Sequence, residues 1–87
     1  MKNSIKKNLQ TNLKIVYSDN ETISVIFNDN NLLMGVAGEF NKNLKELEKL
    51  TGVNLYSRGN SILLKSNNGK NEIVKNAIQF LVDQFIN

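Results

Sequence analysis

The chain of 87 residues contains no cysteine, histidine, proline or tryptophan. Without cysteine and histidine it has no disulfide framework, no thiol nucleophile, no Cys/His metal site and no imidazole for acid–base catalysis. No apolar run approaches the roughly 20 residues that a membrane span needs, and the N-terminus lacks the apolar core of a signal peptide. Most enzyme classes are therefore excluded, and we expect a cytoplasmic protein with no membrane partner.

Acidic residues are absent from the first fourteen positions, where four lysines give a charge of +4. From Ile15 onward, 7 basic and 8 acidic residues give a net charge of −1. The net charge of +3 for the whole chain therefore comes from the N-terminal stretch. We expect residues 1–12 to form a flexible basic arm. Residues 13–87 are expected to form a single domain, because a chain of this length has room for only one core.

Two early stretches are typical of β-strands. In Thr22–Phe27 apolar and polar residues alternate, which predicts a strand with Ile23, Val25 and Phe27 facing inward. The preceding Leu13–Tyr17 also has β character. It either pairs with the next strand as a hairpin or lies as an extended leader along the edge of the sheet.

The stretch Val36–Val53 predicts helix, glycine turn, helix and the start of a strand. Gly38 and Asn41 bracket the turn, and both residue types tolerate positive φ. The second helix places four apolar residues at steps of four, three and three, namely Phe40, Leu44, Leu47 and Leu50. Gly52 is expected to end this helix.

The shorter helix before the turn is expected to begin after a cap at Asp29 or Asn30. Later in the chain, Val53–Ser57 and Ser61–Lys65 predict two antiparallel strands, joined through Arg58-Gly59-Asn60. A last helix from about residue 70 to 85 has a broad apolar face made of Ile73, Val74, Ala77, Ile78, Leu81, Val82 and Phe85. The order β-α-α-β-β-α predicts an α+β two-layer sandwich, with a three-stranded antiparallel sheet and the helices on one face.

This order, with a glycine turn between the first two helices, resembles the KH domain in its type I arrangement over residues 22–86. In such domains a GXXG loop clamps nucleic-acid backbone beside an apolar groove. At the position of that loop the chain has Gly38-Glu39-Phe40-Asn41. Asn41 replaces the second glycine, and Glu39 repels phosphate where a basic residue is favourable. The alternative is a helical hairpin whose turn simply requires glycine.

Several short segments resemble the N-terminal domain of PhoH-like proteins more closely. They are Asn31–Gly35, Gly38, Asn43–Lys45, Thr51–Val53, Ser57–Asn60 and the long closing helix. The resemblance implies that the chain is the KH-like N-terminal module of a longer protein involved in RNA metabolism and the phosphate-starvation response. The P-loop ATPase domain of that protein, with its ATP and magnesium, would lie outside this chain.

The chain itself has no complete P-loop. That motif requires G-x-x-x-x-G-K-[ST], in which the glycines let backbone N–H groups cradle the phosphates. Gly69-Lys70 is the only Gly-Lys pair, and Leu64 and Asn71 occupy the first glycine position and the final hydroxyl position. We therefore expect no cofactor in this chain and no enzyme activity of its own, since no nucleophile–base pair can be named either.

Two functions remain. The first is assistance with binding of single-stranded RNA by the parent protein, through the contacting residues Gly38, Glu39, Phe40, Asn41, Lys42, Lys45 and Arg58. For Lys42, Lys45 and Arg58, the alternative is that they simply belong to an ordinary solvated or salt-bridged surface. The second function is a protein-interaction module without RNA affinity, which docks on the ATPase domain of the same protein or self-associates as a homo-oligomer.

Overall fold

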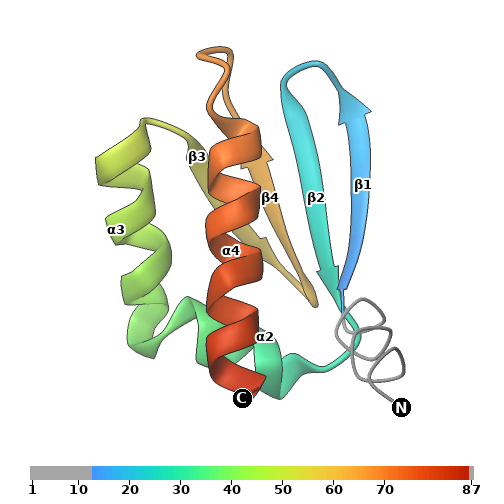
Figure 1. Cartoon of the computed structure of the whole chain (residues 1–87), viewed down its shortest axis with the longest axis vertical. Coiled ribbons are helices and arrows are strands. Elements are labelled where there is room, and N and C mark those ends of the chain that lie inside the picture. The colour runs from blue at the N-terminus through green and yellow to red at the C-terminus, as the bar shows by residue number, and fades with distance from the viewer. Residues whose placement is uncertain (1–12, 87) are drawn as a thin grey trace.

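A computed structural model of the chain describes residues 13–86, apart from the side chains of Phe40 and Ile86. Within this range four strands and three α-helices follow in the order β-β-α-α-β-β-α (Figure 1). The elements are β1 (Leu13–Asp19), β2 (Thr22–Phe27), α2 (Asn30–Ala37), the 3₁₀ turn η1 (Glu39–Asn41), α3 (Lys42–Thr51), β3 (Asn54–Arg58), β4 (Ser61–Lys65) and α4 (Asn71–Ile86). The expected arm, residues 1–12, lies outside the described residues.

The strands form one antiparallel sheet in the order β1-β2-β4-β3. The expectation of three strands was wrong, because β1 pairs with β2 as a hairpin from Leu13 opposite Phe27 onward. This pairing satisfies backbone groups of β2 that would otherwise form an open edge. It also brings Leu13 and Ile15 against the core, so both hydrogen bonding and burial favour the fourth strand.

All three helices lie on one face of the sheet (Figure 1), which makes the domain an α+β structure of two layers. The sheet side chains that face the helices are buried, namely Ile23, Val25, Phe27, Leu55, Ile62 and Leu64. Because successive side chains of a strand point to opposite faces, the residues between them point away from the helices. We call that opposite side of the sheet the outer face.

The short helix α2 is capped as expected. The Asp29 side chain accepts a hydrogen bond from the Asn31 backbone N–H at 2.8 Å, which satisfies one of the free donors at the helix start. In the middle of α2, a Cβ on Gly35 would overlap the ring of Phe85 from α4. Glycine at this position therefore lets the end of α4 pack closely on α2.

No helix within residues 13–86 has the length and apolarity to cross a membrane.

The apolar stripes predicted for the helices are narrower than expected. In α3, Leu44 is buried and Leu47 is partly buried, whereas Leu50 is 71% exposed. With 3.6 residues per turn, Leu50 lies about 120° round the helix from Leu44, too far to reach the same neighbours. In α4, Ile73 and Phe85 are likewise more than half exposed, while Val74, Ile78 and Val82 are buried.

We expect the two leucines of α3 to differ sharply in their contribution to stability. Leu44→Ala should lower the free energy of unfolding by about 2–5 kcal/mol, because it leaves a cavity in the core. Leu50→Ala makes the same chemical change at an exposed position of the same helix, and should lower it by less than about 0.5 kcal/mol. Urea denaturation of the two variants measures both values. Equal losses would contradict the packing described here.

Candidate nucleic-acid interface

The turn between α2 and α3 uses two unusual backbone conformations. Gly38 has φ 81° and ψ 172°, a region open almost only to glycine. Asn41 has φ 58° and ψ 30°, the left-handed conformation that asparagine tolerates better than most residues. Both residues that bracket the turn therefore use the positive φ that their residue types tolerate.

Two backbone N–H groups of the turn are already hydrogen-bonded within the turn. The N–H of Asn41 donates to the carbonyl of Gly38 at 3.0 Å, and the N–H of Lys42 donates to the carbonyl of Glu39. Free backbone N–H groups at the start of a helix can bind a phosphate. Because the 3₁₀ turn occupies these two groups, a phosphate at this place would depend more strongly on side chains.

A side-chain amide ties the two helices together across the turn. Nδ2 of Asn43 donates to the carbonyl of Val36 at 3.0 Å, and so satisfies one of the free carbonyls at the end of α2. A Cβ on Gly38 would lie 2.8 Å from that same nitrogen atom. Gly38 is therefore needed for the helical hairpin itself. The bond spans only seven residues, but an asparagine just after a turn is its only trace in the sequence.

A groove of about 670 Å³ runs beside the turn. Its lining residues come from α2, the turn and the β3–β4 hairpin, and are Asn30, Leu33, Met34, Ala37, Gly38, Glu39, Asn41, Ser57 and Gly59. On the hairpin side, Nδ2 of Asn60 donates to the carbonyl of Phe27 at 2.9 Å, and the Phe27 N–H donates to the Asn60 carbonyl at 2.8 Å. These bonds fix the hairpin tip against the end of β2.

The groove is largely apolar on its α2 side. Leu33 and Ala37 are buried, and Met34 beside them is 67% exposed. Among the residues that the structure describes, Glu39 is the only charged one that lines it. The groove therefore offers apolar surface and backbone groups to a flat or apolar ligand, with one carboxylate at the turn.

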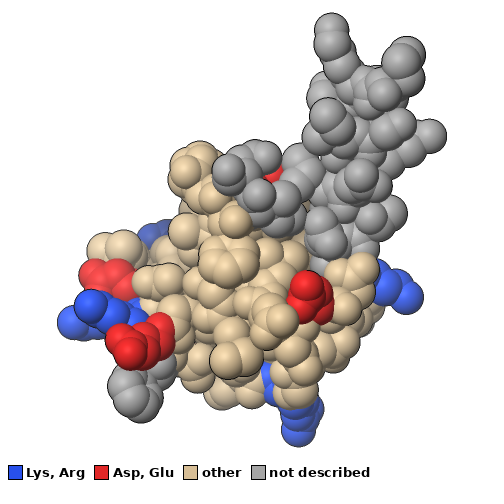
Figure 2. Space-filling model, turned by 90° about the horizontal axis from the view of Figure 1, so that it is seen from below, with Lys and Arg blue, Asp and Glu red and all other residues tan. Residues whose placement is uncertain are grey.

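The structure brings some of the predicted contacting residues together and separates others. Gly38, Glu39 and Asn41 line the groove, while the side chain of Phe40 lies outside the described residues. Lys42 and Lys45 are exposed on α3 and do not line the groove. Figure 2 shows basic and acidic side chains intermingled at one side of the molecule, where α3 lies.

Arg58 does not share the groove with the turn. It is the last residue of β3 and pairs with Ser61 of β4, one step beyond the pair of Ser57 with Ile62. Ile62 is fully buried beneath the helices, so Ser57 points toward the helices and Arg58 points to the outer face. The structure thus places Arg58 on the opposite side of the sheet from Gly38.

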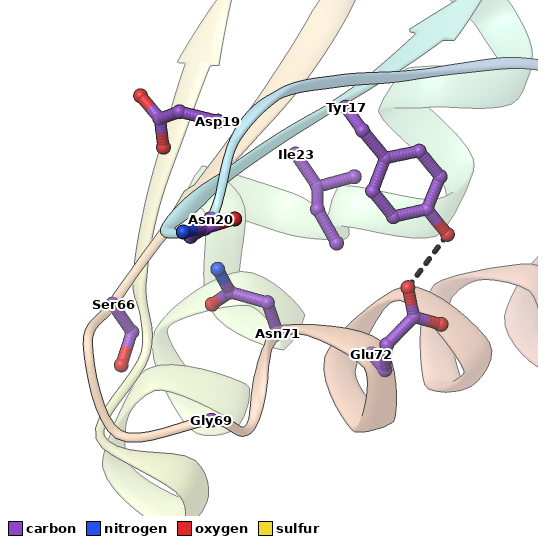
Figure 3. Close-up of a pocket in the computed structure, with 8 residues that line it drawn as sticks. All are labelled: Tyr17, Asp19, Asn20, Ile23, Ser66, Gly69, Asn71 and Glu72. Carbon is purple, nitrogen blue, oxygen red and sulfur yellow. Dashed lines mark hydrogen bonds between the residues drawn. The ribbon is translucent and has the colours of Figure 1, made fainter.

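A second hollow of about 440 Å³ lies between the β1–β2 turn and the start of α4 (Figure 3). Tyr17 donates its hydroxyl hydrogen to Oε2 of Glu72 at 2.6 Å, and Nζ of Lys75 lies 3.0 Å from Oε1. The Tyr17 hydroxyl and then Lys75 hold the pKa of Glu72 below its ordinary value of 4.5. Nδ2 of Asn71 donates to the carbonyl of Glu21, while its buried Oδ1 has no partner among the described residues.

The second hollow shows no chemistry beyond these pairings. Of the two carboxylates that line it, Glu72 is paired with Lys75, whose pKa the bond to Glu72 raises, and Asp19 accepts a hydrogen bond from the Glu21 N–H. Among residues 13–86, no three acidic side chains gather closely enough to hold a metal ion. The groove beside Gly38 therefore remains the better candidate site.

Comparisons with models of known protein families, with curated proteins and with solved structures each find no match.

Substitution of Gly38 should be more damaging than substitution of a second glycine with positive φ. Gly38→Ala is expected to cost about 1–3 kcal/mol, because alanine is strained in this conformation and displaces the Asn43 amide. Gly59 has φ 57° and no atom within 4 Å of an added Cβ. Gly59→Ala should therefore cost only about 1–2 kcal/mol, the penalty of the left-handed conformation. Thermal and urea unfolding compare the stability of the two variants. A smaller loss of stability for Gly38→Ala would contradict the close contact between Gly38 and the Asn43 amide.

The link between Tyr17 and Glu72 predicts a dependence on pH. Since the folded-state pKa of Glu72 is lowered, its contribution to stability is present above the unfolded value of 4.5 and is lost as the pH falls through the folded pKa. In Tyr17→Phe the pKa of Glu72 should rise, because the variant removes the hydroxyl donor and keeps the ring. NMR titration of the Glu72 carboxyl carbon measures the shift. An unchanged pKa in Tyr17→Phe would show that the hydroxyl is not its main cause.

Proposed function

We propose that this chain is a non-catalytic KH-like module that binds single-stranded RNA in the groove beside Gly38. From β2 onward the helices and strands follow the order β-α-α-β-β-α, and a glycine turn joins the first two helices. The observation that carries the proposal is the position of the groove. It lies between that turn and the β3–β4 hairpin, where an apolar groove accompanies the backbone-binding loop of KH domains.

The chemistry of the groove suits bases better than phosphates. The apolar side chains Leu33, Met34 and Ala37 offer a surface against which an unstacked base can lie, and backbone groups of the turn and hairpin are close to its edges. The phosphates would then pass along α3, where Lys42 and Lys45 are exposed. The carboxylate of Glu39 in the turn repels these phosphates, so we expect a modest affinity for RNA.

The parent protein in this proposal is a PhoH-like ATPase. The chain would contribute RNA contacts, whereas the P-loop domain, outside these residues, would supply ATP and magnesium chemistry. Only the segments that resemble the family support this part of the proposal.

The groove proposal is tested by the affinity of the full chain for a fluorescent single-stranded RNA across a range of salt. Lys42→Glu and Lys45→Glu should weaken binding and lower the salt-dependence slope by at least about 0.7 for each lost phosphate contact. Glu39→Lys should strengthen binding, because it replaces a repulsive charge with an attractive one. Met34→Glu should weaken it by placing a carboxylate in the groove.

Lys70→Glu is the matched control for these charge reversals. Lys70 directly precedes α4, which begins at the opposite end of the domain from α2, one wall of the groove (Figure 1). The change in net charge is the same. If Lys70→Glu weakens binding as much as Lys42→Glu does, the effect is one of net charge. If Met34→Glu and Glu39→Lys leave the affinity unchanged, RNA does not bind in the groove.

Protein docking is the second candidate function, and α4 supplies an observation in its favour. Ile73 and Phe80 are 60% and 61% exposed and lie two turns apart, so they form one apolar stripe facing away from the core. The β3 edge is less suited to docking, because the Leu55 N–H already donates to Oε2 of Glu48 at 2.8 Å. A module that self-associates through this stripe should show a mass that rises with concentration, and Phe80→Asp should abolish that rise.

A further inference from the structure

No helix covers the outer face of the sheet among the described residues, since the three helices lie on the other side (Figure 1). The register of the strands arranges its side chains in rows that cross the sheet. One row is Lys14, Ile26, Ser61 and Arg58, and the next is Val16, Ser24, Leu63 and Tyr56. A third row contains Thr22, Lys65 and Asn54.

Tyr56 stands in the middle row and is 50% exposed, although tyrosine buries readily when packing allows. Its cross-strand neighbour Leu63 is only partly buried. Together with Ser57, Arg58 and Lys65, these two residues line a shallow hollow of about 430 Å³ on the sheet. The aromatic ring thus borders an open surface that is large enough for a planar group.

The cations of this face lie on both sides of the ring. Arg58 and Lys65 belong to the rows that flank the row of Tyr56, and rows on one face are about 7 Å apart. Lys14 stands at the far edge of the Arg58 row. Among the described residues one acid lies on this face: Asp19 pairs with Thr22 at the far edge of the Lys65 row and accepts a hydrogen bond from the Glu21 N–H. Three cations against one acid give this face a positive balance, whereas residues 13–86 together carry eight charges of each sign.

An exposed aromatic ring on a sheet, with a cation on each side of it, is suited to binding a single-stranded nucleic acid. Bases stack on aromatic side chains of open sheets, and basic residues nearby contact the phosphates. We infer that the outer face is a second RNA-binding surface, on which one base stacks on Tyr56 while Arg58 and Lys65 contact the adjoining phosphates. This surface is independent of the groove, because it lies on the opposite side of the sheet.

The test is the affinity of the full chain for fluorescent oligouridine, which can stack but forms little structure of its own. Tyr56→Ala should weaken binding at least about fivefold, because it removes a stacking platform. Tyr56→Phe keeps the ring and should stay within about twofold of the unchanged protein. Lys65→Glu should lower the salt-dependence slope by at least about 0.7. The matched charge control is Lys49→Glu, on the helical layer, which should alter the slope less.

NMR spectra recorded during the titration provide a readout that does not depend on variants. The ring protons of Tyr56 and the amides of β3 and β4 should shift as oligouridine is added. Shifts confined to α2 and the turn, with full affinity in Tyr56→Ala, would overturn the outer-face site and leave the groove proposal standing. The reverse pattern, with loss in Tyr56→Ala and none in Met34→Glu, supports the outer face and overturns the groove. No binding of oligouridine at low salt overturns both.

Discussion

The pairing of β2 with β4 is the interaction on which the rest of the domain depends. These strands occupy the middle of the sheet, and their inward side chains Val25, Phe27, Ile62 and Leu64 are completely buried. Because side chains alternate along a strand, this register puts the apolar side chains of both central strands on the side of the helices. A shift of one residue in β4 would turn Ile62 and Leu64 to the outer face and Lys65 toward the helices.

The local features of the fold could be predicted from the sequence, because they depend on chemistry within a few residues. Asp29 caps α2, Gly52 ends α3 in the left-handed conformation, and Gly59 begins the turn of the last hairpin. The partner of Leu13–Tyr17 could not be predicted in the same way. Two arrangements of that stretch satisfy the same local pattern, and only the burial of its apolar residues against a distant core separates them.

The candidate site was predicted only in part. Gly38 and Asn41 could be identified because positive φ restricts the choice of residue. Arg58 was assigned to a turn, whereas the structure makes it the last residue of a strand, and it therefore follows the alternation of β3 onto the outer face. Asn43 and Asn60 were missed as clamps. Their amides bond carbonyls 7 and 33 residues away, and no periodicity in the sequence records such contacts.

The two asparagine clamps have a consequence for recognition. Asn43 fixes the end of α2 and Asn60 fixes the tip of the opposing hairpin, so that both walls of the groove are set before any ligand arrives. A binding site of this kind loses little conformational entropy of its own when it is filled. Most of the ordering cost then falls on the ligand, and stiffening the ligand would raise the affinity more than any further rigidity in the protein.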